Sequence, residues 1–211
     1  MRGIVGIILA FEYDRDGNDF VIRGSLPFLG KTIIEHTYEV LKSSEIKTIC
    51  VYTNSKGIKL KKYLGNKVKY LVHQNNHHYT TISIKMAFEN SLDLFDNLLI
   101  IDAQYPLIDE FIINSLMFEH LQNKNDLTYI SYIWNNSVII PNIFIINSEL
   151  FITLFENRYS NKEINIHNII ELAILHDKKT QFIQTTYGFK VIKISSRNEL
   201  AALESCFNKK R

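Results

Sequence analysis

Two arginines and one aspartate are the residues of this 211-residue chain whose types and positions best suit chemistry. Arg15 and Arg23 lie in the polar stretch 11–30, which follows the first apolar segment of the chain. A guanidinium group presents a rigid, bidentate set of donors that matches phosphate oxygens. Asp102 ends the apolar segment 97–102, and a carboxylate at the end of a buried strand can hold Mg²⁺ on a bound nucleotide. Together these residues suit the binding of a polyphosphate.

A simpler interpretation stays open for each of these side chains. Arg15 and Arg23 would then be solvated loop charges, and Asp102 would cap a turn. Long stretches without regular structure inside a compact domain are usually either functional or disordered. The functional interpretation therefore depends on whether the fold brings the two loops together.

The elements that must position these residues alternate along the chain. Short apolar runs alternate with amphipathic stretches, which is typical of a mostly parallel sheet with crossover helices. Strands are predicted at 3–10, 47–53, 69–72, 97–102, 127–134, 138–146, 181–186 and 189–194. Helices are predicted at 32–43, 55–64, 81–92, 108–121, 148–156, 165–176 and 196–208. The strand 138–146 contains Pro141 and is therefore expected at an edge of the sheet.

This pattern predicts an α/β fold with one doubly wound sheet. No repeat, low-complexity tract or linker interrupts it, so we expect a single domain over residues 1–211. Ligands of such sheets bind beyond the carboxyl ends of the strands, at the point where the strand order reverses. We expect the stretch 11–30 and the loop after Asp102 to lie at that edge.

The composition excludes several kinds of partner. A net charge of +2 gives no basic field that would favour a nucleic acid. No apolar run approaches the roughly 20 residues that cross a membrane, so no membrane partner is expected. Cys50 and Cys206 are the only cysteines and lie far apart, which argues against a structural zinc site. They favour a reducing compartment, and we expect the protein to be cytoplasmic.

Four segments resemble motifs of the methylerythritol-phosphate and ribitol-phosphate cytidylyltransferases, within the nucleotidyltransferase superfamily. The sequence GKTIIEHT at 30–37 resembles the family's GKPIIxHT, and DAQYPL at 102–107 resembles DAxRPL. The sequence PNIF at 141–144 is similar to part of TPQxF, and the segment 190–201 is similar to NIKITTPxDL. Their order and approximate spacing hold across nearly the whole chain. The resemblance implies a Rossmann-like nucleotidyltransferase domain of the GT-A-like kind.

The activity implied by the resemblance is the transfer of a nucleotidyl group. A small sugar- or polyol-phosphate would attack a nucleoside triphosphate, with CTP favoured, and pyrophosphate would leave. Arg15 and Arg23 match the basic residues that hold the triphosphate in the family. Asp102 matches the aspartate that binds Mg²⁺ or orients the substrate, and Lys193 matches the lysine near the substrate phosphate. The implied cofactor is Mg²⁺.

Two further residues are placed beside the nucleotide by the resemblance. Ala10 falls at the start of the family's glycine-rich loop, and Ser83 is similar to the serine that contacts the cytosine side. The chain departs from the family in this loop, because it has none of the glycines that let backbone N–H groups approach a phosphate closely. Glu12, Asp14 and Asp16 also add negative charge where a triphosphate would lie.

Two alternative functions stay open. The loss of the loop glycines favours a catalytically degenerate relative that acts in nucleotide sensing or partner binding. A second alternative is an enzyme like the sugar-1-phosphate uridylyltransferases, whose closing motif resembles the segment 200–204. That alignment places Gln104 where the family has a metal-binding aspartate, and so leaves the metal without this ligand.

Other departures concern the second substrate and the dimer. Tyr105 replaces the arginine of the family's DAxR motif, and Ile140 replaces the threonine before the proline. The family's dimer arm is expected to be missing, because too few residues separate Pro106 from Pro141. We therefore expect a monomer, or association through another surface.

Overall fold

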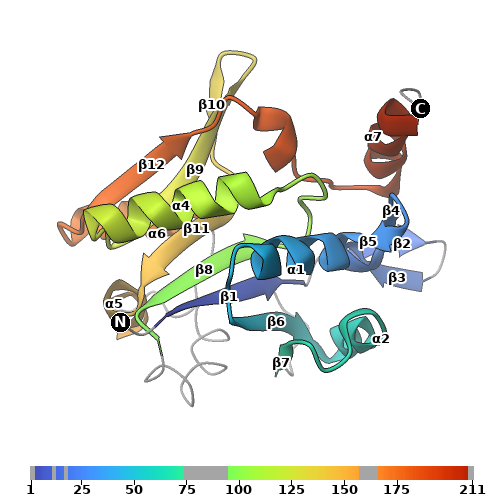
Figure 1. Ribbon diagram of the computed structural model, residues 1–211, viewed down its shortest axis with the longest axis horizontal. Coiled ribbons are helices and arrows are strands. Elements are labelled where there is room, and N and C mark those ends of the chain that lie inside the picture. Colours follow the sequence, from blue (N-terminus) through green and yellow to red (C-terminus); the bar gives the residue numbers. More distant parts are fainter. Residues whose placement is uncertain (1–2, 11–12, 17–18, 74–94, 157–165, 209–211) are drawn as a thin grey trace.

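The computed structural model describes residues 3–10, 13–16, 19–73, 95–156 and 166–208 (Figure 1). Among them, eight strands form one mixed sheet in the order β10-β9-β11-β8-β1-β6-β7, with β12 also paired to β9. The strands of this sheet are β1 (Ile4–Leu9), β6 (Thr48–Asn54), β7 (Lys69–His73), β8 (Asn97–Asp102), β9 (Leu127–Trp134), β10 (Ser137–Ile139), β11 (Ile143–Asn147) and β12 (Thr180–Gln184).

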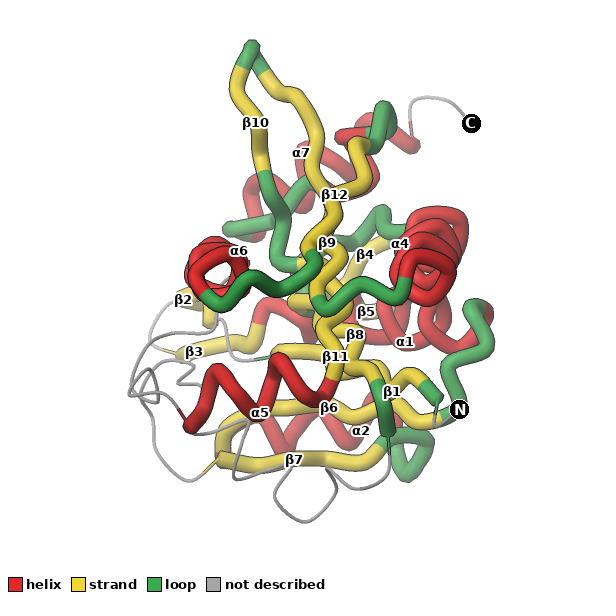
Figure 2. The backbone as a smooth tube through the Cα atoms, turned by 90° about the vertical axis from the view of Figure 1, so that its left-hand side faces the viewer, coloured by secondary structure: helices red, strands yellow, loops and turns green. Residues whose placement is uncertain are grey.

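Helices cover both faces of the sheet, as Figure 2 shows for α4 and α6 on its opposite sides. The longer helices are α1 (Ile33–Ser43), α4 (Glu110–Asn123), α5 (Ser148–Glu156), α6 (Ile166–Leu175) and α7 (Arg197–Asn208). Alternate residues of β8 belong to different cores, because successive side chains of a strand point to opposite faces. Leu99 and Ile101 pack with α1 and α4 in one core, and Leu98 and Ile100 pack with α5 and α6 in the other. The predicted doubly wound α/β class is confirmed.

The centre of the sheet is parallel and contains the reversal of strand order. From β1 the chain passes to β6 on one side, and it later returns to β8 on the other side. Both neighbours run parallel to β1, with Leu9 opposite Tyr52 in β6 and opposite Asp102 in β8. The carboxyl ends of the three strands therefore meet at one edge, where this kind of fold binds its ligands.

The polar stretch 11–30 contains more regular structure than the sequence predicted. A separate hairpin of β2 (Tyr13–Asp16) and β3 (Asp19–Ile22) is followed by the 3₁₀ turn η1 (Arg23–Ser25). Two short strands then lead into α1, namely β4 (Pro27–Phe28) and β5 (Lys31–Thr32). The segment 13–22 alternates little in hydrophobicity and carries several charges, so its pairing could not be foreseen from its pattern.

The predicted strand 138–146 is wrong in two respects. It is interrupted at 140–142 and forms β10 and β11, which both run antiparallel to β9. Ile139 lies opposite Tyr132 and Phe144 opposite Tyr129, so the four residues 140–143 are matched by only two residues, 130–131, on β9. β11 is not at an edge, since it lies between β8 and β9. Pro141 lies in this interruption, where no strand pairing requires the backbone N–H that proline lacks.

Other predicted elements need smaller corrections. The segment 189–194 forms the 3₁₀ turn η4 (Gly188–Val191) and then extended chain, instead of a strand. The predicted helix 55–64 consists of the 3₁₀ turn η2 (Ser55–Leu60) and one turn of α-helix, α2 (Lys61–Leu64). The predicted helix 81–92 lies outside the described residues. In the region where the family has its dimer arm, β9 and β10 form a short hairpin that projects from the sheet (Figure 1).

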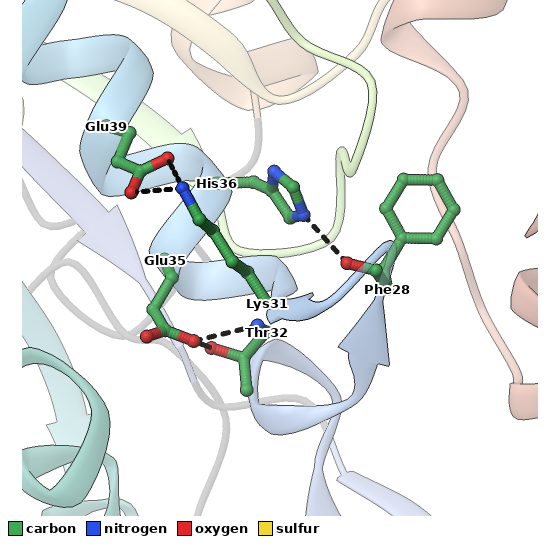
Figure 3. Close-up of polar contacts among 6 residues, drawn as sticks. All are labelled: Phe28, Lys31, Thr32, Glu35, His36 and Glu39. Atoms are coloured by element: carbon green, nitrogen blue, oxygen red, sulfur yellow. Dashed lines mark hydrogen bonds and ion pairs between the residues drawn. The ribbon is translucent and has the colours of Figure 1, made fainter.

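The motif at 30–37, one of the four that resemble the family, forms the start of α1 (Figure 3). The Glu35 carboxylate accepts hydrogen bonds from the backbone N–H and the hydroxyl of Thr32, at 2.8 and 2.6 Å. Burial would raise the pKa of Glu35, but these hydrogen bonds and nearby positive charge outweigh it and leave that pKa lowered. His36 Nε2 lies 2.8 Å from the Phe28 carbonyl oxygen, and Lys31 pairs with Glu39. These contacts give most of the motif a structural role.

A buried polar network joins α4 to the sheet at the edge opposite Asp102. The His120 ring is 2% exposed, with Nδ1 3.0 Å from Thr128 Oγ1 and Nε2 2.9 Å from Asn97 Oδ1. Thr128 Oγ1 also accepts a hydrogen bond from Asn125 Nδ2. Asn97 Oδ1 can only accept, so the proton of the neutral ring lies on Nε2, and the Thr128 hydroxyl donates to Nδ1. Burial lowers the pKa of His120 to about 4, although the charge of Asp126 opposes this shift.

We expect this network to make stability depend on pH below neutrality. The pKa of His120 is depressed from 6.5 to about 4 on folding. Its stabilising contribution is therefore complete above pH 6.5 and is lost as the pH falls through 4, by about 3 kcal/mol over that range. The free energy of unfolding, measured by urea denaturation, should fall less steeply in this window for His120→Gln than for the parent chain. His176→Gln, at an exposed position, is the control and should keep the parent's slope.

Candidate active site

Asp102 is the centre of the candidate active site. It is the last residue of β8, it is 3% exposed, and it lies at the carboxyl edge beside Leu9. Asn142 Nδ2 donates a 2.8 Å hydrogen bond to its Oδ1, and Lys193 Nζ lies 3.4 Å from its Oδ2. A buried carboxylate is costly unless donors surround it, and these two side chains supply donors from distant parts of the chain.

Tyr105 holds Asn142 in place. Its side chain is buried, and its hydroxyl oxygen accepts a 2.8 Å hydrogen bond from the backbone N–H of Asn142. Burial is the main cause that raises the pKa of Tyr105 well above its usual value, and the charge of Asp102 adds to this effect. The phenol therefore stays neutral. Tyr105, which stands where the resembled motif has an arginine, thus holds the backbone between β10 and β11 in place. From this position the Asn142 side chain contacts Asp102.

Arg23 joins the first loop to the loop that follows Asp102. Its Nη1 donates a 3.1 Å hydrogen bond to Oε1 of Gln104, whose side chain is buried. The two loops pack so closely here that a Cβ at Gly24 would lie 3.1 Å from the Cβ of Ala103. The two loops that the sequence singled out therefore meet in space.

Lys193 reaches the site from the C-terminal part of the chain. The backbone N–H of the next residue, Ile194, donates a 2.9 Å hydrogen bond to the Gln104 carbonyl oxygen. The Lys193 side chain remains 40% exposed although its ammonium group is close to Asp102. The ammonium group can therefore contact both the buried carboxylate and an anion that arrives from solvent.

The remaining predicted site residues have different positions. Ala10 is buried, its N–H donates to the Tyr52 carbonyl, and its own carbonyl accepts from Thr53 Oγ1 at 2.7 Å. Both of its backbone groups thus serve the sheet. Arg15 lies in β2 opposite Phe20, and its side chain is outside the described part of the structure. Ser83 lies outside the described residues.

A cavity of about 200 Å³ lies against Lys193 and Asn142. Its wall includes residues of the chain segments around β10, η4 and the start of α6, among them Tyr132, Ile140 and His167. A larger hollow of about 690 Å³ lies between α4 and β12, but its lining includes none of the predicted site residues. Of these two cavities, only the smaller one adjoins Lys193 and Asn142, the two residues that contact Asp102, so it is the candidate site.

Sequence reasoning missed Asn142, Gln104 and His167 as members of this region. The match at 141–144 pointed to the right segment, but the sequence alone could not show that Asn142 would face a strand end 40 residues earlier. Within the described ranges, no group of three or more histidines, cysteines, aspartates and glutamates could hold a metal ion. No described helix is long and apolar enough to cross a membrane.

Comparisons with known proteins define the class of fold. No protein-family model and no curated protein sequence matches the chain. Solved nucleotidyltransferase structures do match it over nearly its whole length. The chain therefore has the Rossmann-like fold of the nucleotidyltransferases, as the resemblance implied.

Three of these structures show the range of the similarity. The 4-diphosphocytidyl-2C-methyl-D-erythritol synthase of Anaerococcus prevotii has a TM-score of 0.76 and 13% identity, covering 98% of this chain and 99% of that one. A putative glucose-1-phosphate thymidylyltransferase of Bacillus anthracis has a TM-score of 0.78 and 14% identity, with coverages of 97% and 95%. A CMP:2-keto-3-deoxy-manno-octonic acid synthetase in complex with CTP has a TM-score of 0.71 and 9% identity, with coverages of 99% and 100%.

We expect the Tyr105 hydroxyl to stabilise the site measurably. Tyr105→Phe leaves the Asn142 N–H without its acceptor and should lower the free energy of unfolding by about 1–3 kcal/mol. Tyr70→Phe is a matched control, because the buried Tyr70 hydroxyl has no hydrogen-bond partner in the described part of the chain. Its removal should cost little or nothing in the same denaturation experiment. Equal losses for the two variants would contradict the positioning role of Tyr105.

Proposed function

We propose that this protein is a nucleotidyltransferase, which transfers a nucleoside monophosphate from a nucleoside triphosphate to a small phosphorylated acceptor and releases pyrophosphate. The observation that supports this most directly is the meeting of Asp102, Lys193 and the Arg23–Gln104 pair at the strand edge of a nucleotidyltransferase fold. Ligands of this kind of fold bind at that edge. The similarity to a synthetase in complex with CTP supports CTP as the favoured nucleotide.

The proposed mechanism relies on positioning and on charge. An oxygen of the acceptor phosphate attacks the α-phosphorus of the nucleotide, and the bond from that phosphorus to the pyrophosphate breaks. Arg15 and Arg23 neutralise the charge on the β- and γ-phosphates, which grows as pyrophosphate leaves. Lys193 binds the acceptor phosphate, because its side chain is 40% exposed and an incoming anion can therefore reach it. Holding both reactants in line supplies much of the remaining rate increase.

The residues fit a magnesium ion that is shared with the nucleotide. Asp102 offers a carboxylate, the kind of oxygen ligand that Mg²⁺ prefers, and the described residues offer no cluster for a cage made by protein alone. Mg²⁺ commonly binds through one or two carboxylates together with substrate phosphates. Asp102 would therefore hold the ion. When bound, Mg²⁺ supplies positive charge that stabilises the departing pyrophosphate.

The proposed setting is a single domain, 1–211, in the cytoplasm. Cys50 and Cys206 are both free thiols, which suits a reducing compartment. The short β9–β10 hairpin takes the place of the family's dimer arm and supports the proposal of a monomer, or of association through another surface.

The second candidate is a catalytically degenerate relative of the nucleotidyltransferases that only binds a nucleotide. It is supported by Ala10, whose backbone N–H and carbonyl both form hydrogen bonds within the sheet. Its N–H is thus not available to a phosphate, and the β2–β3 hairpin stands where the family has its glycine-rich loop. Nucleotide binding without turnover would then be the function. The uridylyltransferase-like alternative has less support, because Gln104 binds Arg23 and Asp102 occupies the strand end.

Replacing Asp102 with Asn should abolish magnesium-dependent turnover. The variant keeps the shape of the side chain but loses the charge that holds the ion, so pyrophosphate release with CTP should fall by about 100-fold or more. The parent should likewise lose activity when EDTA removes Mg²⁺. Asp177→Asn, at an exposed position, should leave release unchanged. A parent that binds CTP but releases no pyrophosphate with any acceptor would favour the binding-only relative.

Replacing Arg23 with Met should mainly weaken nucleotide binding. The change removes a positive charge from the first loop while it keeps a flexible, unbranched aliphatic stem. We expect the Kd for CTP, measured by titration calorimetry, to rise by about tenfold. Arg197→Met, at an exposed position on α7, is the matched control. An unchanged Kd in the Arg23 variant would mean that this arginine only ties the two loops together.

A further inference from the structure

The acceptor cavity has a charged end and an apolar wall. Lys193 and Asn142 lie at the end next to Asp102. Five aliphatic residues from three segments of the chain contribute to the rest of the lining: Ile139, Ile140, Pro141, Ile166 and Val191. Apolar lining with a few placed polar groups selects a ligand whose body is apolar.

Few polar atoms of the described lining remain available to a ligand. The Tyr105 hydroxyl already accepts from the Asn142 backbone, and Asn142 Nδ2 already donates to Asp102. Asn142 Oδ1 is buried and has no hydrogen-bond partner among the described residues, so it can accept from one donor of a ligand. Besides Asn142 and Lys193, the polar ends of Tyr132 and His167 are the side-chain groups of this lining that could pair with a ligand hydroxyl. A polyol chain carries several hydroxyls, and each one buried without a partner lowers affinity by about tenfold.

We propose that the acceptor is a phosphate monoester with a short, branched hydrocarbon body and at most one hydroxyl close to the phosphate. Its phosphate binds Lys193, its hydroxyl donates to Asn142 Oδ1, and its hydrocarbon part packs against Ile140 and Ile166. This inference rests on the proposed function, because it treats the cavity as the acceptor site. The inferred acceptor, an alkyl phosphate, differs from the sugar- and polyol-phosphates that the sequence-based prediction named.

The test compares two phosphates of similar size by titration calorimetry with the full chain and without nucleotide. Isopentyl phosphate should bind at least tenfold more tightly than erythritol 4-phosphate. Ile140→Thr adds a hydroxyl to a partly buried part of the wall and should narrow this ratio at least threefold. Ile133→Thr, the same change at an exposed position outside this cavity, should leave the ratio unchanged. Lys193→Met should abolish the binding of both phosphates.

Three results would overturn the inference: equal or tighter binding of erythritol 4-phosphate, no binding of either phosphate, or binding that survives Lys193→Met. The proposed function is tested separately by pyrophosphate release with CTP. If the alkyl phosphate binds as expected but no nucleotide is turned over, the cavity assignment holds and the proposed reaction fails. If a polyol phosphate is the better ligand and is also turned over, the reaction stands and the inferred acceptor class is wrong.

Discussion

The buried carboxylate of Asp102 is the constraint on which the candidate site depends. A charge in this position requires donors, and the chain brings them from the segment before β11 and from the segment after η4. Each donor is then fixed by a second contact: Tyr105 holds Asn142 through its backbone, and Gln104 holds the residue after Lys193. The Gln104 side chain also accepts a hydrogen bond from Arg23. The short loop that follows Asp102 therefore positions Asn142, Lys193 and Arg23.

Local patterns of the sequence sufficed to predict most of the fold. β8, β9 and α5 have the predicted bounds, because an apolar strand or an amphipathic helix is visible within a few residues of chain. The buried stripe of α1 likewise consists of the five predicted residues, Ile33, Ile34, Thr37, Tyr38 and Leu41. The predictions failed where distant contacts decide the structure. The strand 138–146 is divided at the residues that include Asn142, whose contacts with Asp102 and Tyr105 no local pattern encodes.

The site itself could be predicted only in outline. The loops of Arg23 and Asp102 were chosen because parallel strands end at one edge, and the structure brings them together. Asn142 could not be foreseen, because a single asparagine after a proline has many possible partners. The motif at 30–37, one of the four that resemble the family, turned out to serve largely as a helix start. Similarity in such a motif reports a shared architecture and says little about shared chemistry.

The late position of Lys193 in the chain has a consequence for biosynthesis. Translation proceeds from the N-terminus, so β1, β6 and β8 are all made before residue 193. During that interval the Asp102 carboxylate lacks its cationic partner at the edge of a growing hydrophobic core. The paired charges of the candidate site are therefore complete only after residue 193 has been made.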